Sequence, residues 1–167
     1  ESVAGMVATP RPVRRIGSAP RQGESITVEV PTHVAGVIRF VSGAIVQVAT
    51  SFDVAGHRHA PIELYGTEGT LMVPDPNRFG GPVQLLPTGG EWQEIPVTAP
   101  YADGNFRGIG AADMAGAIQA GRPHRASGAL ALHVLEVMEA FGRSSDAGRF
   151  IAIETRVERP APFSGLE

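Results

Sequence analysis

The stretch "HVAGVIRFVSGAIVQVATSF", residues 33–52, reads as two strands joined by a tight turn. Two apolar runs meet across Ser42-Gly43, a two-residue connection of the kind that closes a β-hairpin. Just before it, residues 25–30 alternate between apolar and polar side chains, which is typical of a half-buried strand that Pro31 ends or displaces. The sequence therefore predicts three successive antiparallel strands.

A further hairpin is predicted at "IELYGTEGTLMVPDPN", residues 62–77. Gly66 and Gly69 lie on either side of a two-residue turn, and a glycine-rich loop can also hold a phosphate group. A phosphate loop, however, needs a helix directly after it and usually a lysine. Here the residues from Leu71 onward continue as a strand, and all 14 basic residues are arginine. We therefore interpret the two glycines as part of a hairpin turn.

The second half of the chain changes in character. Residues 107–121 and 127–141 read as helices, because Gly121 fits the end of the first and Ser127 fits an N-cap of the second. On the second helix the apolar side chains gather on one arc, so this helix is expected to pack on a sheet. Strands followed by helices predict an α+β fold, with a mainly antiparallel open β-sheet and helices packed on one face.

The chain has 167 residues, of which 43% are apolar, enough to bury the core of one ordinary domain. We expect that domain to span residues 1–160, followed by a tail over residues 161–167. The sheet face away from the helices is too apolar for free solvent and too polar for a core, which suits a homo-oligomer contact. Its predicted residues are Thr27, Glu29, Val37, Arg39, Val41, Ile45, Gln47, Ala49 and Tyr65.

The composition argues against several classes of partner. The formal net charge is -3 and the arginines are scattered, so no basic stripe for nucleic acid is expected. The chain has no cysteine, hence no disulfide and no thiolate metal site, which fits a reducing cytoplasm. No apolar run approaches the roughly 18 to 20 residues that span a bilayer, so no membrane contact is expected. We expect a soluble, cytoplasmic protein.

Two short motifs have more than one interpretation. "GIGAAD", residues 108–113, is the nearest approach to a dinucleotide fingerprint, but it lacks the third small residue and a preceding buried parallel strand. We interpret it as small residues at the start of a helix. His57 and His59 would face the same side of a strand, one geometry for a metal pair, yet only Asp53 lies nearby as a further ligand. A polar contact to a small ligand is therefore favoured over a metal.

Three other candidates for chemistry lie elsewhere in the sequence. A hydrolytic triad of Ser51, Asp53 and a histidine is disfavoured, because Ser51 lies within a strand pattern and not at a nucleophile elbow. His133, on the edge of the apolar arc, is interpreted as a hydrogen-bonded boundary residue. The loop "YADGNFRG", residues 101–108, offers hydroxyl, carboxylate, amide and guanidinium groups that fit a polyol. The alternative, a polar loop whose arginine pairs with an acid, stays equally open.

Four stretches of the sequence together resemble a known family. In order and spacing they are similar to the C-terminal half of the glucose-fructose oxidoreductase, inositol dehydrogenase and rhizopine-catabolism family (Gfo/Idh/MocA). The resemblance covers roughly residues 1–160. The stretches are "PTHVAGVIRFVSGAIVQVATSFDV", "IELYGTEGTLMVPDPNRFGGPV", "NFRGIGAADMAGAI" and "GRPHRASGALALHVLEVMEA".

The resemblance implies a two-domain enzyme of which this chain is one part. In such an enzyme an N-terminal Rossmann domain holds NAD or NADP, and a C-terminal α+β domain binds substrate and mediates dimers or tetramers. Hydride transfer then runs between a sugar or cyclitol carbon and the nicotinamide. The family's glycine-rich fingerprint and its Glu-Lys-Pro motif with the catalytic lysine have no counterpart in these 167 residues.

We therefore expect the substrate-binding and oligomerisation half of an NAD(P)-dependent sugar or cyclitol oxidoreductase, inactive alone. No catalytic, cofactor-binding or metal-binding residue is assigned in this chain, and NAD or NADP belongs to the intact enzyme. Arg125 and His133, although within the resemblance, are interpreted as scaffold. The alternative is a stand-alone binding or assembly module that uses the exposed sheet face and has no redox role. By analogy with the family, the polar contacts to a sugar or polyol are His57, Arg58, Tyr101, Asn105 and Arg107.

Overall fold

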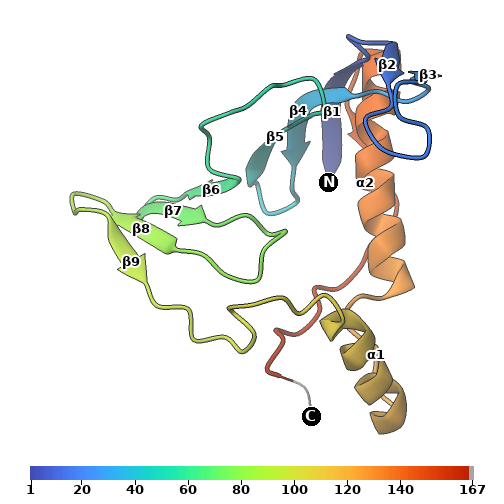
Figure 1. The fold of residues 1–167 in the computed structure, drawn as a ribbon. Helices are drawn as coiled ribbons and strands as arrows, with labels where there is room; N and C mark the ends of the chain where they lie inside the picture. Colours follow the sequence, from blue (N-terminus) through green and yellow to red (C-terminus); the bar gives the residue numbers. More distant parts are fainter. Residues whose placement is uncertain (166–167) are drawn as a thin grey trace. The chain divides into compact units, whose positions relative to one another are not determined.

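The computed structural model describes residues 1–165 of the chain (Figure 1). The chain divides into two compact units. Unit 1 comprises residues 1–56 and 128–158, and unit 2 comprises residues 57–127 and 159–167. The expectation of a single domain over residues 1–160 stays a prediction. Antiparallel strands and two helices confirm the predicted α+β class.

Unit 1 is built on an antiparallel four-stranded sheet in the order β10-β1-β4-β5. Strands β4 and β5 form the predicted hairpin and pair over seven residues each. The connection is not the predicted two residues, because the Phe40 N–H donates to the Ala44 carbonyl at 2.9 Å and leaves Val41, Ser42 and Gly43 in the turn. Gly43 in this turn has a φ of 91°. This left-handed conformation is cheap only for glycine, which explains why the turn residue is a glycine. The strands are β1 (Ser2–Ala8), β4 (His33–Arg39), β5 (Ile45–Ser51) and β10 (Ile151–Ala152).

Helix α2 (Gly128–Ala147) covers one face of this sheet and lies alongside β1 in Figure 1. Its buried residues Ala140 and Phe141 pack against Val3 of β1 and form the centre of the core. Gly5 and Gly36 are paired across β1 and β4, and a Cβ atom on either would lie within 3 Å of the Phe141 ring. The two glycines therefore leave the space that the ring fills. Partly buried residues around this centre are Val7, Val34, Ile38, Val48, Val137, Ile151 and Ile153.

The outer edge of β1 is paired with β10 only at Ser2 and Val3. Beyond this point, helix α2 supplies the missing acceptors. The Ser144 hydroxyl accepts the Gly5 N–H at 3.0 Å and donates to the Arg149 carbonyl at 2.8 Å. Side-chain acceptors thus satisfy backbone groups that an open sheet edge would leave unpaired.

The strand predicted over residues 25–30 forms only in part and has a different partner. β3 (Ser25–Thr27) pairs with β2 (Val13–Arg15) in a separate two-stranded sheet. The expectation that it continues the β4-β5 hairpin was wrong, because β1 occupies the second edge of β4 over seven paired residues. Pro31, which cannot donate to a ladder, separates the two sheets in sequence.

Unit 2 holds a second antiparallel sheet in the order β6-β7-β8-β9, together with helix α1 (Ile109–Ala120). The second predicted hairpin is confirmed, since the Gly66 N–H donates to the Gly69 carbonyl at 2.9 Å and β7 follows directly. Gly121 ends α1 in the left-handed conformation, as predicted from its position before Pro123. The strands are β6 (Ile62–Tyr65), β7 (Gly69–Val73), β8 (Val83–Pro87) and β9 (Gln93–Ile95).

The sheet face of unit 1 opposite to α2 is open among the described residues. The register places the side chains of Val37, Arg39, Ile45, Gln47 and Ala49 on this face, as predicted. Met6 joins them from β1 and is 76% exposed, while Ile45 is 73% exposed. We call this surface the open face.

Four residues assigned to that face do not lie on its strands. Thr27 belongs to the two-stranded sheet, and Tyr65 belongs to the sheet of unit 2. Glu29 lies outside the strands, and Val41 lies in the turn between β4 and β5. The Tyr65 hydroxyl donates to the Glu63 carboxylate, and this hydrogen bond raises the pKa of Tyr65. Alternation along single strands predicted a common face correctly within one sheet, but it could not predict how many sheets there are.

Candidate functional site

The loop that we predicted as a polyol contact carries an aromatic cluster in unit 2. The Tyr101 and Phe106 rings meet edge to face with centroids 5.0 Å apart, and Phe106 meets Phe79 at 5.6 Å. The Phe163 ring lies 5.8 Å from the Tyr101 ring, centroid to centroid. Tyr101 has a φ of 61°, the one positive φ at a non-glycine position among the described residues. Contacts with two aromatic rings therefore hold a backbone conformation that an isolated tyrosine would avoid.

Arg107 is held by one of its two terminal amino groups. Its Nη2 donates to the Asn77 carbonyl at 3.0 Å and to the Asn77 Oδ1 at 2.9 Å. Among residues 1–165 no acidic side chain pairs with Arg107, and its partner there is the neutral Asn77. A guanidinium has five N–H donors, so the contact with Asn77 fixes the group and leaves other donors for a ligand. Asn105, two residues earlier, is exposed.

His57 and Arg58 lie in the irregular segment before β6 and are exposed. The rings of His57 and His59 stack with centroids 6.5 Å apart, although no strand forms there to align them. Among residues 1–165, no three His, Cys, Asp or Glu side chains lie close enough to hold a metal ion. No hydrogen bond or ring contact within the described residues joins His57 or Arg58 to Tyr101, Asn105 or Arg107. Their common role as substrate contacts stays a prediction.

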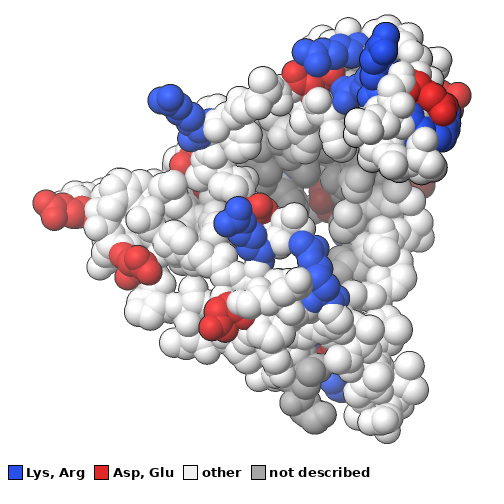
Figure 2. Space-filling view, in the orientation of Figure 1, with Lys and Arg blue, Asp and Glu red and all other residues white. Residues whose placement is uncertain are grey.

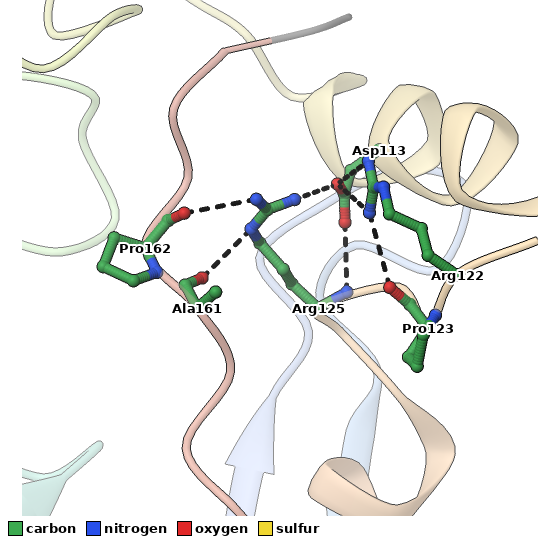
Figure 3. Close-up of polar contacts among 6 residues, drawn as sticks. All are labelled: Asp113, Arg122, Pro123, Arg125, Ala161 and Pro162. Atoms are coloured by element: carbon green, nitrogen blue, oxygen red, sulfur yellow. Dashed lines mark hydrogen bonds and ion pairs between the residues drawn. The ribbon is translucent and has the colours of Figure 1, made fainter. Parts of the chain in front are cut away.

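The most densely bonded polar cluster of unit 2 surrounds Asp113 on α1 (Figure 3). Asp113 is 6% exposed and accepts the backbone N–H of Arg125 at 3.0 Å. The Arg125 guanidinium pairs with the same carboxylate, and Arg122 approaches it at 3.5 Å. The N–H of Arg125, followed by its positive charge, holds the pKa of Asp113 below its ordinary value despite the burial.

Arg125 also binds the segment that follows residue 158. Its Nε donates to the Ala161 carbonyl at 3.0 Å, and its Nη2 donates to the Pro162 carbonyl at 3.2 Å (Figure 3). These contacts agree with the interpretation of Arg125 as scaffold. From the sequence, Asp113 was interpreted only as a departure from the glycine fingerprint. The pattern that could have indicated the Asp113 cluster is an acidic residue inside a predicted helix, followed within twelve residues by two arginines.

A second polar cluster, in unit 1, ties α2 to the segment after β10. The Glu136 carboxylate accepts the N–H groups of Glu154 at 2.8 Å and Thr155 at 2.9 Å, and also the Thr155 hydroxyl. His133 Nδ1 lies 2.8 Å from the same hydroxyl oxygen, which confirms its interpretation as a hydrogen-bonded boundary residue. The Glu154 N–H and then the Thr155 hydroxyl lower the pKa of Glu136 to about 2.

This carboxylate predicts an acid-dependent loss of stability. The pKa of Glu136 is about 2 in the folded chain against an ordinary value of 4.5, so its contribution is present above pH 4.5 and is lost as pH falls toward 2. We expect Glu136→Gln to lower the free energy of unfolding at pH 7, and the difference from wild type to shrink between pH 4.5 and 2. Urea titrations across that range measure it. Glu139→Gln, exposed on the same helix, is the matched control, and an equal pH dependence of both variants would contradict the prediction.

The hydrolytic triad is not assembled. The Asp53 carboxylate binds Arg14 at 2.7 Å and the Thr32 hydroxyl at 2.6 Å, and the Ser51 hydroxyl accepts the Asp53 N–H at 3.0 Å. Within residues 1–165 no histidine hydrogen-bonds to Ser51 or Asp53. Ser51 and Asp53 therefore form a turn at the end of β5, and the ion pair of Asp53 with Arg14 holds this turn in place.

The described residues do not fit a dinucleotide site. Gly108 and Gly110 lie at the start of α1, but the preceding strand β9 ends at Ile95 and belongs to an antiparallel sheet. A dinucleotide fingerprint needs a parallel strand that leads directly into the helix. Because the 167 residues also contain no lysine, no step of hydride transfer is assigned to this chain.

Charges on the face shown in Figure 2 are of both signs, which lie side by side at the upper right and are scattered over uncharged surface elsewhere. The basic side chains visible there form no continuous row that could follow a run of phosphate groups. Neither helix in the described part of the chain is long and apolar enough to cross a membrane.

Comparisons with known proteins place this fold. Residues 1–72 match the family model described as GFO/IDH/MocA C-terminal domain. No curated protein sequence matches the chain. Among solved structures, the apo form of levoglucosan dehydrogenase has 22% sequence identity and a TM-score of 0.73, over 93% of this chain and 46% of that one.

Two further structures give the same result. An oxidoreductase domain protein from Kribbella flavida has 20% identity and a TM-score of 0.73, over 92% of this chain and 44% of that one. Aldose-aldose oxidoreductase from Caulobacter crescentus, complexed with glycerol, has 20% identity and a TM-score of 0.65, over 90% of this chain and 40% of that one. The chain thus spans less than half the length of these structures.

The fold is therefore one that also occurs within larger oxidoreductases. At these identities the structural likeness establishes the fold alone, and the family model adds the sequence relationship over β1 to Met72. The match of residues 1–72 to the GFO/IDH/MocA C-terminal domain model confirms the resemblance stated from the sequence over that part of the chain.

Proposed function

We propose that this chain is the substrate-binding and oligomerisation half of an NAD(P)-dependent sugar or cyclitol oxidoreductase, and that it is not active alone. The match of residues 1–72 to the C-terminal domain model carries the proposal. Levoglucosan dehydrogenase has been solved with NADH and levoglucosan and with NADH and L-sorbose, and the Caulobacter crescentus enzyme with glycerol. These bound molecules are polyhydroxy compounds, so a sugar or polyol is the proposed substrate class here.

In this proposal the chain binds and orients the substrate, and the partner half supplies NAD or NADP with the hydride chemistry. Arg107 is the best supported contact, because Asn77 fixes its guanidinium and leaves donors for hydroxyl groups. Tyr101 and Asn105 lie on the same loop, and the aromatic cluster restrains that loop. His57 and Arg58 complete the proposed set from the segment before β6. The cytoplasmic location stays a prediction.

Binding of a polyol tests the substrate part of the proposal. We expect levoglucosan or L-sorbose to bind the chain weakly in saturation-transfer NMR, and Arg107→Ala to weaken binding about tenfold. Arg21→Ala, an exposed arginine of unit 1 paired with Glu24, is the matched control and should bind as wild type does. Equal binding by the two variants, or no binding of levoglucosan, L-sorbose, glycerol or myo-inositol to wild type, would count against the proposal.

The oligomeric state tests the second part of the proposal, which is oligomerisation through the open face. Ile45 is 73% exposed on that face, so we expect a dimer or larger species by light scattering, and a folded monomer for Ile45→Lys. Leu132→Lys, an apolar residue of α2 that is 57% exposed, is the control and should keep the wild-type mass. A wild-type chain that is monomeric at every concentration would remove the assembly role.

The alternative, a stand-alone assembly module without redox role, depends on the same open face. It differs from the main proposal in the first test, because a pure assembly module has no reason to bind polyols through Arg107. Assembly without polyol binding would therefore favour the alternative.

A further inference from the structure

Arg125 binds the segment over residues 159–165 through its side chain. Nε and Nη2 of Arg125 donate to the carbonyls of Ala161 and Pro162, while Nη1 pairs with the buried carboxylate of Asp113. The Arg125 Cζ also lies over the Phe163 ring, 5.2 Å from its centroid. All three nitrogen atoms of the guanidinium and the adjacent ring are thus engaged, so the position of Phe163 is closely defined.

The Phe163 ring, held in this way, contacts Tyr101. It lies 5.8 Å from the Tyr101 ring, and the Phe106 ring also contacts Tyr101, with centroids 5.0 Å apart. Tyr101 is also the residue with the unfavourable φ of 61°, a conformation that persists only where neighbours enforce it. The two residues are 62 positions apart in sequence, so this contact is not a consequence of local chain geometry.

We propose that Phe163, held by Arg125, is a positioning residue that sets the Tyr101 hydroxyl for a polyol bound at the 101–107 loop. The inference rests on the proposed function, because it concerns the same substrate site. It goes further by making the 159–165 segment a part of that site rather than a tail. An aromatic ring at position 163 is the required feature, since it must contact the guanidinium with one surface and Tyr101 with another.

The test uses the full 167-residue chain with ring-labelled tyrosine. The chain has two tyrosines, Tyr65 and Tyr101, so Tyr65→Phe assigns both sets of NMR signals. We expect Phe163→Leu to shift the Tyr101 ring signals, leave those of Tyr65 in place and weaken levoglucosan binding about fivefold. Phe163→Tyr, which keeps the ring, should restore both properties. The thermal unfolding midpoint should be nearly the same in all three chains.

Phe150→Leu is the matched control, because the Phe150 ring also lies 5.2 Å from an arginine, Arg39, but belongs to unit 1. It should change neither the Tyr101 signals nor the binding. Unmoved Tyr101 signals in Phe163→Leu would overturn the positioning role. Moved signals with unchanged levoglucosan affinity would also overturn it, while the proposed function would stand if Arg107→Ala still weakened binding. Absence of polyol binding by wild type would overturn both proposals.

Discussion

Gly36→Ala is expected to destabilise unit 1 by about 3 kcal/mol or more. An added Cβ would lie 2.3 Å from the Ala4 carbonyl oxygen and 2.7 Å from the Gly5 Cα. Both atoms belong to the backbone of β1, which is paired with β4 along its whole length. The clash can therefore be relieved only if the two central strands move apart. Urea unfolding followed by circular dichroism measures the loss.

Two other glycines provide controls for this prediction. At Gly5 the nearest atom is Phe141 Cδ1 at 2.6 Å, a side-chain atom, and at Gly17 nothing lies within 4 Å. Gly17→Ala should therefore be close to neutral, and Gly5→Ala should fall between the other two. Adding Phe141→Leu should recover part of the stability lost in Gly5→Ala but little of that lost in Gly36→Ala. Equal losses for Gly36→Ala and Gly17→Ala would contradict the packing account.

The parts of the fold that could be predicted are those that neighbouring residues determine. Ser42-Gly43 predicted that β4 and β5 form a hairpin but not its register, because the turn also contains Val41 and Arg39 therefore pairs with Ile45. Gly121 before Pro123 predicted the end of α1. The apolar arc of the second helix predicted that α2 packs on a sheet, since its periodicity matches a single buried face.

The choice of strand partner could not be predicted in the same way. The alternation in residues 25–30 indicates a strand, but it contains nothing that distinguishes β2 from β4 as its neighbour. The close fit of Gly5, Gly36 and Phe141 combines residues from three elements far apart in sequence. Such fits depend on register and packing that exist only once the chain has folded.

Prediction of the candidate site from the sequence was limited in the same way, by contacts between residues far apart in the chain. The donors and acceptors of the 101–107 loop could be recognised from residue types alone. The contact of Phe163 with Tyr101 and the burial of Asp113 could not, because both depend on the return of residues 159–165 to unit 2. A polar loop is recognisable from its sequence, whereas the groups that hold it in place are recognisable only from the structure.

Phe141→Ala is expected to lower the free energy of unfolding by about 3–5 kcal/mol. The Phe141 ring is 5% exposed and lies against Val3 and the two strand glycines at the centre of the unit 1 core. Because Gly5 and Gly36 have no side chains, the two strand positions directly against the ring offer nothing to fill the space that it leaves. The cavity would therefore persist, and the cost lies at the upper end of the range for such truncations.

Phe150→Ala removes the same side chain from a surface position and is the matched control. Phe150 is 48% exposed and meets only the Arg39 guanidinium among the ring contacts of the described residues, so we expect a loss of about 1 kcal/mol or less. Both variants are compared with wild type in urea at pH 7. A domain of this size is stable by only about 5–15 kcal/mol, so the core variant should lose a large fraction of its stability and unfold at a clearly lower urea concentration. Similar losses in the two variants would mean that the contact of α2 with β1 and β4 is not what holds unit 1 together.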